Sequence, residues 1–235
     1  MDFAHNLELL VHDQEVVCER VSEARLRISG PIDESFVRCL QSNRDGNLNT
    51  IIVNSPGGEV EISMKAGAEI DKKYSVIVEN YCASSCVNYI LPAARYIYIS
   101  HGAVILFHGF VDENDVNYAK EHAMEIVLAN APKDKNIDVT KVARHMIEDT
   151  IRQKDVQDKY LEKYSVNLKA FRKYDGIYIG GNCEDKFVYP SYGQMKKAYL
   201  KFDRLHYASI SKSEFSKLNT KFKEYNLDKC IYYGG

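Results

Sequence analysis

The sequence predicts an α/β fold in which a parallel sheet is followed by a helix-rich C-terminal part. Up to Phe110, short apolar blocks of strand length alternate with helical patterns of about 10–15 residues, which is typical of parallel strands joined by right-handed crossovers. Turns rich in Gly, Pro and Ser end several of these blocks. Beyond Phe110 the pattern becomes mostly helical. We therefore expect an α/β core over residues 1–130 and a helix-rich extension over residues 131–235 that packs on it.

The composition is that of an ordinary folded protein. The chain has 235 residues, of which 45% are hydrophobic and 27% are charged, and this excludes disorder and fibrous repeats. Its 31 basic and 33 acidic residues give a net charge of −2, so neither nucleic acid nor an anionic membrane is the expected partner. No apolar run approaches the length of about eighteen residues that a membrane span requires.

The first elements follow from alternation and from turn residues. A strand is expected at Arg25–Ser29, where apolar and basic residues alternate, and Asp33 is expected to cap the helix after it. A second strand, Asn49–Asn54, stops at the turn Ser55–Gly58, and apolar residues then recur about every four positions along a helix. A third strand, Ser75–Glu79, leads through a Cys- and Ser-containing segment to an apolar helical stretch.

The later elements are two strands, several helices and a small hairpin. The strand-like segments Tyr96–Ser100 and Ala103–His108 end the alternating part. The predicted helices are Asp115–Asn130, Val139–Tyr164, Asn167–Tyr174, Ser191–Lys201 and Glu214–Tyr225. The hairpin would join Ile177–Ile179 to Lys186–Tyr189 through a turn at Gly180-Gly181.

The six cysteines are an even number, as in proteins that carry disulfides. They are Cys18, Cys39, Cys82, Cys86, Cys183 and Cys230. This count favours an extracytoplasmic location, with a signal already removed, over the cytoplasm. Cys18 with Cys39 and Cys183 with Cys230 are possible pairs, although spacing does not determine connectivity. No cysteine has histidine partners at zinc spacing, so we expect no metal and no cofactor.

Three features at strand ends are candidates for one functional site. Gly57-Gly58 would let a substrate backbone approach closely and leave N–H groups free to donate. Ser84 or Ser85, at the start of a helix, could be a nucleophile or only an N-cap. A neutral imidazole at His108 could accept the proton of a serine. Each feature alone also has a purely structural explanation, as a loop, a cap or a strand-end histidine.

In their order along the chain, these segments resemble a known family. Gly30–Asp33, Asn54–Gly58, Ala83–Ser85 and Val104–His108 resemble the signature of the proteolytic subunit of Clp protease and of its relatives in the ClpP/crotonase superfamily, which includes signal peptide peptidase A. The resemblance covers residues 25–110 and is nearest to an uncharacterised, often periplasmic branch. It implies repeated ββα and βα units around a parallel sheet, and the activity of a serine peptidase.

The resemblance also implies roles for individual residues. Ser85 falls at the position of the nucleophile and His108 at that of the general base, with Ser84 as the nucleophile if the turn is shifted by one residue. The N–H groups of Gly58 and Cys86 fall at the oxyanion hole. Gly57 and Gly58 together fall at the edge where relatives bind their peptide as an added strand.

The third member of the triad lacks its recognisable neighbourhood. Asp155 and Asp158 stand at about the distance from the histidine that the family requires, and Asp149 stands slightly nearer. All three are equally compatible with a solvated helix face. A serine and histidine without an orienting aspartate retain part of their rate, because a triad loses rate rather than all catalysis when one member is missing.

The expected function is hydrolysis of peptide bonds in a peptide or an unfolded protein, without a cofactor. Relatives form trimers or stacked rings, so the resemblance implies a homo-oligomer. The sequence contains no phosphate-binding loop of the ATPase type, and any unfolding motor would be a separate chain. The alternative is a catalytically inactive peptide- or acyl-binding module on the same scaffold. The acyl-CoA chemistry of the crotonase branch is less favoured, because it does not need a serine and a histidine at these positions.

Overall fold

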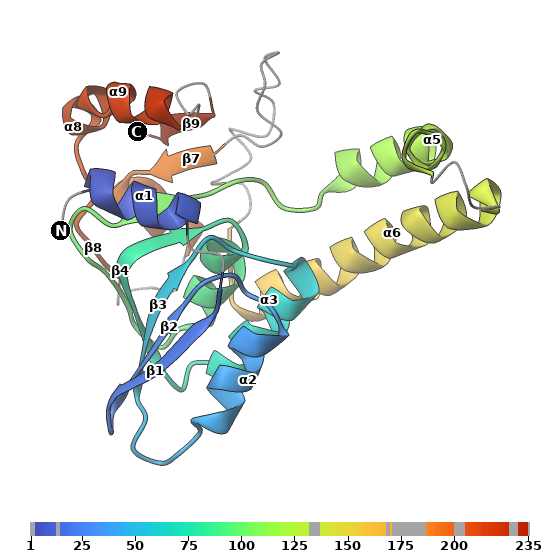
Figure 1. The fold of residues 1–235 in the computed structure, drawn as a ribbon. Helices are drawn as coiled ribbons and strands as arrows, with labels where there is room; N and C mark the ends of the chain where they lie inside the picture. The colour runs from blue at the N-terminus through green and yellow to red at the C-terminus, as the bar shows by residue number, and fades with distance from the viewer. Residues whose placement is uncertain are drawn as a thin grey trace. The chain divides into compact units, whose positions relative to one another are not determined.

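The computed structural model describes residues 3–12, 15–131, 137–167, 170, 187–199, 205–225 and 230–234. Its fold is a mixed α/β architecture with a mostly parallel sheet and a helical C-terminal region, which confirms the predicted fold class (Figure 1). The chain divides into two compact units, Met1–Gly109 with Tyr164–Gly235, and Phe110–Lys163. The first unit is discontinuous because the chain returns to the main sheet at Leu205–Tyr207, after the second unit.

The main sheet contains seven strands among the described residues. They are β1 (Val17–Ser22), β2 (Arg25–Ser29), β3 (Thr50–Ser55), β4 (Ser75–Ala83), β5 (Ile97–Ile99), β6 (Val104–Leu106) and β8 (Leu205–Tyr207). The order is β1-β2-β3-β4-β5-β8, and β6 lies beside β4. β1 and β2 are antiparallel, and the other described pairs of this sheet are parallel. The five strands predicted up to His108 therefore lie in one sheet, whereas β1 was not predicted because most of its residues are exposed and show no alternation.

The register of the central strands explains why their sequences are apolar. Ile28 pairs with Val53, and Val53 pairs with Val78, and all three side chains are fully buried. The first part of β4 pairs with β5 and its last residues pair with β6. The end of β4 therefore has a neighbouring strand on each side, which holds the following turn in a defined position.

Short helices complete the first unit. They are α1 (Phe3–His12), α2 (Glu34–Ser42), α3 (Val60–Ile70), the π-helix η1 (Cys86–Ile90), α4 (Leu91–Ala93), α7 (Tyr192–Ala198), α8 (Lys212–Lys217) and α9 (Asn219–Glu224). Asp33 caps α2 as predicted, since its carboxylate accepts hydrogen bonds from two N–H groups of the first turn. The single helix predicted at Glu214–Tyr225 is instead the pair α8 and α9, which meet at Leu218.

A small second sheet pairs β7 (Phe187–Pro190) in parallel with β9 (Ile231–Gly234). β7 is the described arm of the predicted hairpin. The other arm, Ile177–Ile179, and its turn lie outside the described residues, as does most of the predicted helix Asn167–Tyr174. Phe107, directly after β6, forms an isolated bridge with Val188, so the small sheet is tied to the segment that carries His108.

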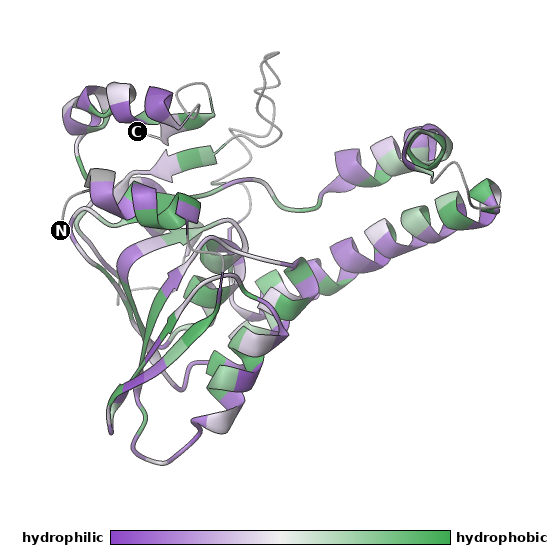
Figure 2. Cartoon of the chain, in the orientation of Figure 1, coloured by the Kyte–Doolittle hydropathy of each residue, from purple (hydrophilic) through white to green (hydrophobic). Residues whose placement is uncertain are grey.

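The second unit consists of α5 (Glu113–Asn130) and α6 (Val139–Lys163), close to the two helices predicted there. Asp112 begins α5 with a capping box. Hydrophilic and hydrophobic residues alternate along α6 (Figure 2), as in an amphipathic helix. Gln157 of α6 donates to the Val111 carbonyl (2.9 Å) and accepts from its N–H (3.2 Å), which fixes the start of this unit. In the described ranges, no helix is both long enough and apolar enough to traverse a bilayer.

Disulfides link several of these elements. Cys18 of β1 is bonded to Cys39 of α2, which is one of the two pairs considered from the sequence, and Cys82 is bonded to Cys86. Cys230 is also disulfide-bonded. Its possible partner Cys183 lies outside the described residues. The cysteines of the described residues are thus all in disulfides, and the location of the protein stays a prediction.

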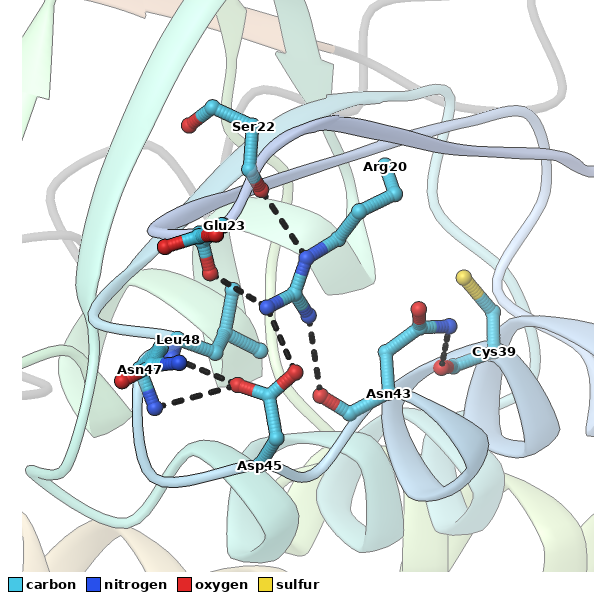
Figure 3. Close-up of polar contacts among 8 residues, drawn as sticks. All are labelled: Arg20, Ser22, Glu23, Cys39, Asn43, Asp45, Asn47 and Leu48. Atoms are coloured by element: carbon cyan, nitrogen blue, oxygen red, sulfur yellow. Dashed lines mark hydrogen bonds and ion pairs between the residues drawn. The ribbon is translucent and has the colours of Figure 1, made fainter.

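A polar network fixes the loop between α2 and β3 near the first disulfide (Figure 3). Arg20 donates to the carbonyls of Ser22 (2.9 Å) and Asn43 (3.1 Å) and to the carboxylate of Asp45 (2.6 Å). The Asp45 carboxylate also accepts from the Leu48 N–H at 2.9 Å. The Arg20 guanidinium and the N–H groups of Leu48 and Asn47 lower the pKa of the Asp45 carboxylate.

Candidate active site

The first wall of the site is the glycine turn after β3. Gly57 has a φ of +106°, a conformation that side chains disfavour, and its N–H donates to the Ser55 hydroxyl at 3.1 Å. Ile32 donates to the Gly57 carbonyl at 2.7 Å and forms a bridge with Gly58. A Cβ at Gly57 would lie only 2.7 Å from the Cβ and 3.1 Å from the hydroxyl of Ser84. Glycine is therefore required here both by the backbone and by the neighbouring serine.

The second wall is the sharp turn between β4 and η1, with Ser84 at its tip. Ser84 has a φ of +54°, which for a non-glycine residue costs about 1–3 kcal/mol and is maintained only by the surrounding structure. Its N–H donates to the Leu106 carbonyl at 2.8 Å, and its carbonyl accepts from the Asn88 N–H at 3.1 Å. Such strain is concentrated at functional sites.

His108 meets Ser84 at this point. The last residues of β4 pair with β6, Ala83 with Leu106, so the residues that follow each strand lie at the same edge of the sheet. The Ser84 hydroxyl and His108 Nε2 are in hydrogen-bond contact. Phe187 packs edge-on against the imidazole, with ring centroids 5.3 Å apart. Ser84 and His108 are both half-buried, so the pair is fixed and still partly accessible.

Ser85, which the resemblance placed at the position of the nucleophile, directs its hydroxyl to the glycine turn and not to His108. Its backbone is already helical, with φ −56° and ψ −24°, and its side chain is only 4% exposed. The Ser85 hydroxyl donates to the Gly58 carbonyl at 2.7 Å. Ser84, the alternative nucleophile for a turn shifted by one residue, is the serine whose hydroxyl contacts His108. Ser85 instead anchors the glycine turn.

Cys86, expected to provide a second oxyanion donor, is the first residue of η1. It is fully buried and bonded to Cys82 near the end of β4. The three residues enclosed by this disulfide are Ala83, Ser84 and Ser85. The turn that carries the candidate nucleophile is therefore closed by a covalent bond.

The π-helix after the serine turn depends on a distant tyrosine. The Leu91 N–H donates to the Cys86 carbonyl, five residues back, and Pro92 has no N–H that could bond the next carbonyl, that of Val87. Tyr199 donates to the Val87 carbonyl at 2.6 Å. Burial raises the pKa of the Tyr199 hydroxyl, which keeps it a donor. No signal in the sequence connects positions separated by 112 residues.

Asn88 is a second residue that the sequence did not single out. Its side-chain amide donates at 3.3 Å to the carbonyl of Gly109, directly after His108, while its N–H holds the Ser84 carbonyl. Asn88 is 2% exposed. It therefore connects the backbone of the serine turn to the backbone beside the imidazole.

The aspartates considered from the sequence lie on α6 in the second unit. Asp158 pairs with Lys154 at 2.8 Å, Asp149 pairs with Arg152 at 3.3 Å, and Asp155 is exposed. An orienting role for Asp155 or Asp158 stays a prediction. In the described part of the chain, no three His, Cys, Asp or Glu side chains form a group that could hold a metal ion.

Comparison with solved structures finds chains that match this one. No protein-family model matches the chain, and no curated protein matches it. A mutant of the 1510-N membrane-bound stomatin-specific protease matches with a TM-score of 0.30 and 17% sequence identity, over 54% of this chain and 69% of that chain.

Proposed function

We propose that this chain is a serine-type hydrolase in which Ser84 is the nucleophile and His108 is the general base. The contact between the Ser84 hydroxyl and His108 Nε2 carries this proposal. A serine hydroxyl is a weak nucleophile at neutral pH, and a hydrogen-bonded imidazole activates it by accepting its proton. The strained, partly accessible position of Ser84 supports the same role.

The reaction follows from these two side chains. Ser84 Oγ attacks the substrate carbonyl carbon while His108 Nε2 takes the hydroxyl proton. The tetrahedral intermediate then expels its leaving group, which receives that proton from His108. Water, deprotonated by the same imidazole, next attacks the acyl-enzyme and releases the acid and the free serine.

Two backbone amides are proposed to stabilise the oxyanion. The Ser85 N–H follows the nucleophile at the N-cap position of η1, where N–H groups have no partner within the helix. Gly58 is exposed, its carbonyl accepts from Ser85 and the Gly57 carbonyl accepts from Ile32, so the backbone that carries the Gly58 N–H is anchored. Ser85 replaces the donor assigned to Cys86, because the nucleophile moves by one residue. Loss of one such donor typically costs about 2.7–4 kcal/mol of transition-state stabilisation.

The proposed substrate is a peptide or an unfolded protein, and the proposed assembly is a homo-oligomer. Both come from the resemblance of residues 25–110 to the Clp protease subunit and its relatives. An extended peptide would lie beside Gly57 and Gly58 as an added strand, with main-chain hydrogen bonds providing most of the affinity. This mode of binding makes the enzyme weakly selective for sequence.

A fluorophosphonate probe tests the proposal, because it modifies only an activated serine. We expect the wild-type chain to be labelled on Ser84, and we expect Ser84→Ala and His108→Ala to abolish or nearly abolish labelling. Ser85→Ala is the matched control, since it removes the adjacent hydroxyl. It should slow labelling through the loosened glycine turn without preventing it.

The site of labelling is read from the tryptic peptide between Lys73 and Arg95, which contains both serines. Equal labelling of wild type and Ser84→Ala, or no labelling of wild type, would refute the proposal. An unlabelled chain that still binds extended peptides would be the inactive binding module. Cleavage of a fluorescent unfolded protein by wild type, but not by Ser84→Ala, would establish the peptide substrate.

A further inference from the structure

The disulfide between Cys82 and Cys86 encloses the proposed nucleophile. Cys82 lies on β4, where it pairs with Ser55 on one side and with Ile105 on the other. Cys86 begins η1, and the two Cα atoms are 5.4 Å apart. Both cysteines are fully buried. The bond therefore joins the end of a strand clamped in the sheet to the first residue of the helix that follows.

This connection restricts the conformation that places the hydroxyl beside the imidazole. The chain passes from strand to helix through three residues, and Ser84 adopts positive φ to do so. Serine does not prefer that region, so the neighbouring structure must maintain it. The hydrogen bonds of Ser84 with Leu106 and Asn88 contribute. They are made by backbone groups that can also bond water, whereas the disulfide keeps both ends of the turn at a fixed separation.

From this geometry we propose that Cys82 and Cys86 are positioning residues, whose disulfide keeps Ser84 in reach of His108. The inference rests on the proposed function. Without the bond, Ser84 relaxes toward negative φ and its hydroxyl moves away from Nε2. A misplacement of about 1 Å at a reacting atom costs on the order of a hundredfold in rate. The hydrolase is then active only as the oxidised chain.

The Cys18–Cys39 disulfide provides an internal control. It joins β1 to α2 and takes no part in the contacts of Ser84 or His108. Cys18 is exposed whereas Cys82 and Cys86 are fully buried, so a reductant should reduce Cys18–Cys39 first and Cys82–Cys86 only at a higher dose. Removing either disulfide should destabilise the fold, but only removal of Cys82–Cys86 should also slow the reaction of Ser84 in the folded chain.

The test compares two double variants by the rate of fluorophosphonate labelling and by thermal unfolding. Cys82→Val with Cys86→Ala removes the proposed positioning bond while keeping apolar side chains in the buried space. Cys18→Ala with Cys39→Ala removes the control bond. At a temperature where circular dichroism shows both to be folded, we expect the first variant to label about a hundredfold more slowly. We expect the control to stay within about twofold of wild type, because distant sites act independently.

The pH profile separates positioning from stability. In the wild type the labelling rate should follow deprotonation of one histidine, and His108→Ala should remove that dependence. The Cys82/Cys86 variant should show the same flattened profile, because its serine no longer reaches the imidazole. A folded variant that labels at the wild-type rate, with the wild-type profile, would overturn the inference.

Partial reduction of the wild-type chain tests the inference if the variant does not fold. Dithiothreitol supplies two electrons and two protons to each disulfide and becomes a cyclic disulfide itself. After labelling and alkylation, the tryptic peptide between Lys73 and Arg95 reports the probe and the state of both cysteines together. We expect the probe on peptides with the disulfide intact and not on alkylated ones. Equal labelling of the two forms would refute the inference, and an unreactive wild type would refute it together with the proposed function.

Discussion

Replacing Gly57 by alanine should disable the site more than it harms the fold. A Cβ at this position would lie 2.7 Å from the Ser84 Cβ, whereas ordinary contact begins at 3.4 Å. The Ser84 side chain or the turn must therefore move by about 0.7 Å, the difference between these two distances. A shift of about 1 Å costs on the order of a hundredfold in rate. We accordingly expect labelling of Ser84 to fall by roughly ten- to a hundredfold.

The effect of this substitution on stability follows from the backbone of Gly57. Its φ of +106° costs a side-chain-bearing residue about 1–3 kcal/mol. For a chain of this size, each kcal/mol lowers the melting temperature by roughly 2–4 °C. Gly46→Ala is the control, because nothing lies within 4 Å of its added Cβ. Labelling of Gly57→Ala at the wild-type rate would show that the glycine turn does not border the reacting hydroxyl.

Two further predictions concern stability. Tyr199→Phe leaves the buried Val87 carbonyl without its donor, which should reduce the free energy of unfolding by about 1–3 kcal/mol in denaturant melts. The control Tyr192→Phe, on the exposed start of α7, should change it little. Equal free energies of unfolding for the two variants would contradict the role of this hydrogen bond. Asp45 has a lowered pKa in the folded chain, so its pairing with Arg20 stabilises the fold above the ordinary aspartate pKa of about 3.9 and is lost as the pH falls through the folded value. The melting temperatures of wild type and Asp45→Asn should therefore differ at neutral pH and converge in acid, and a constant difference would exclude this linkage.

Tertiary contacts also explain which residues the sequence did not identify. Tyr199 donates to the Val87 carbonyl, for which Pro92 has no N–H in the π-helical pattern. No local sequence pattern indicates that this carbonyl needs a distant donor. Asn88 resembles any polar residue of an apolar helix until its amide is seen to bond Gly109. β8 pairs with β5 although more than a hundred residues separate them, so the first compact unit contains residues from both ends of the chain.

The alternation of strands and helices, the cap at Asp33 and the set of segments at one edge of the sheet were all predictable from the amino-acid pattern. Apolar periodicity reports burial, and the carboxyl ends of parallel strands necessarily share an edge. It took the folded chain to show that Ser84, and not Ser85, has its hydroxyl beside His108. Two adjacent small residues are equivalent in a local pattern, whereas in the structure Ser84 has positive φ, donates to the Leu106 carbonyl and lies against the glycine turn. Those contacts come from segments far apart in the chain, so they exist only once it has folded.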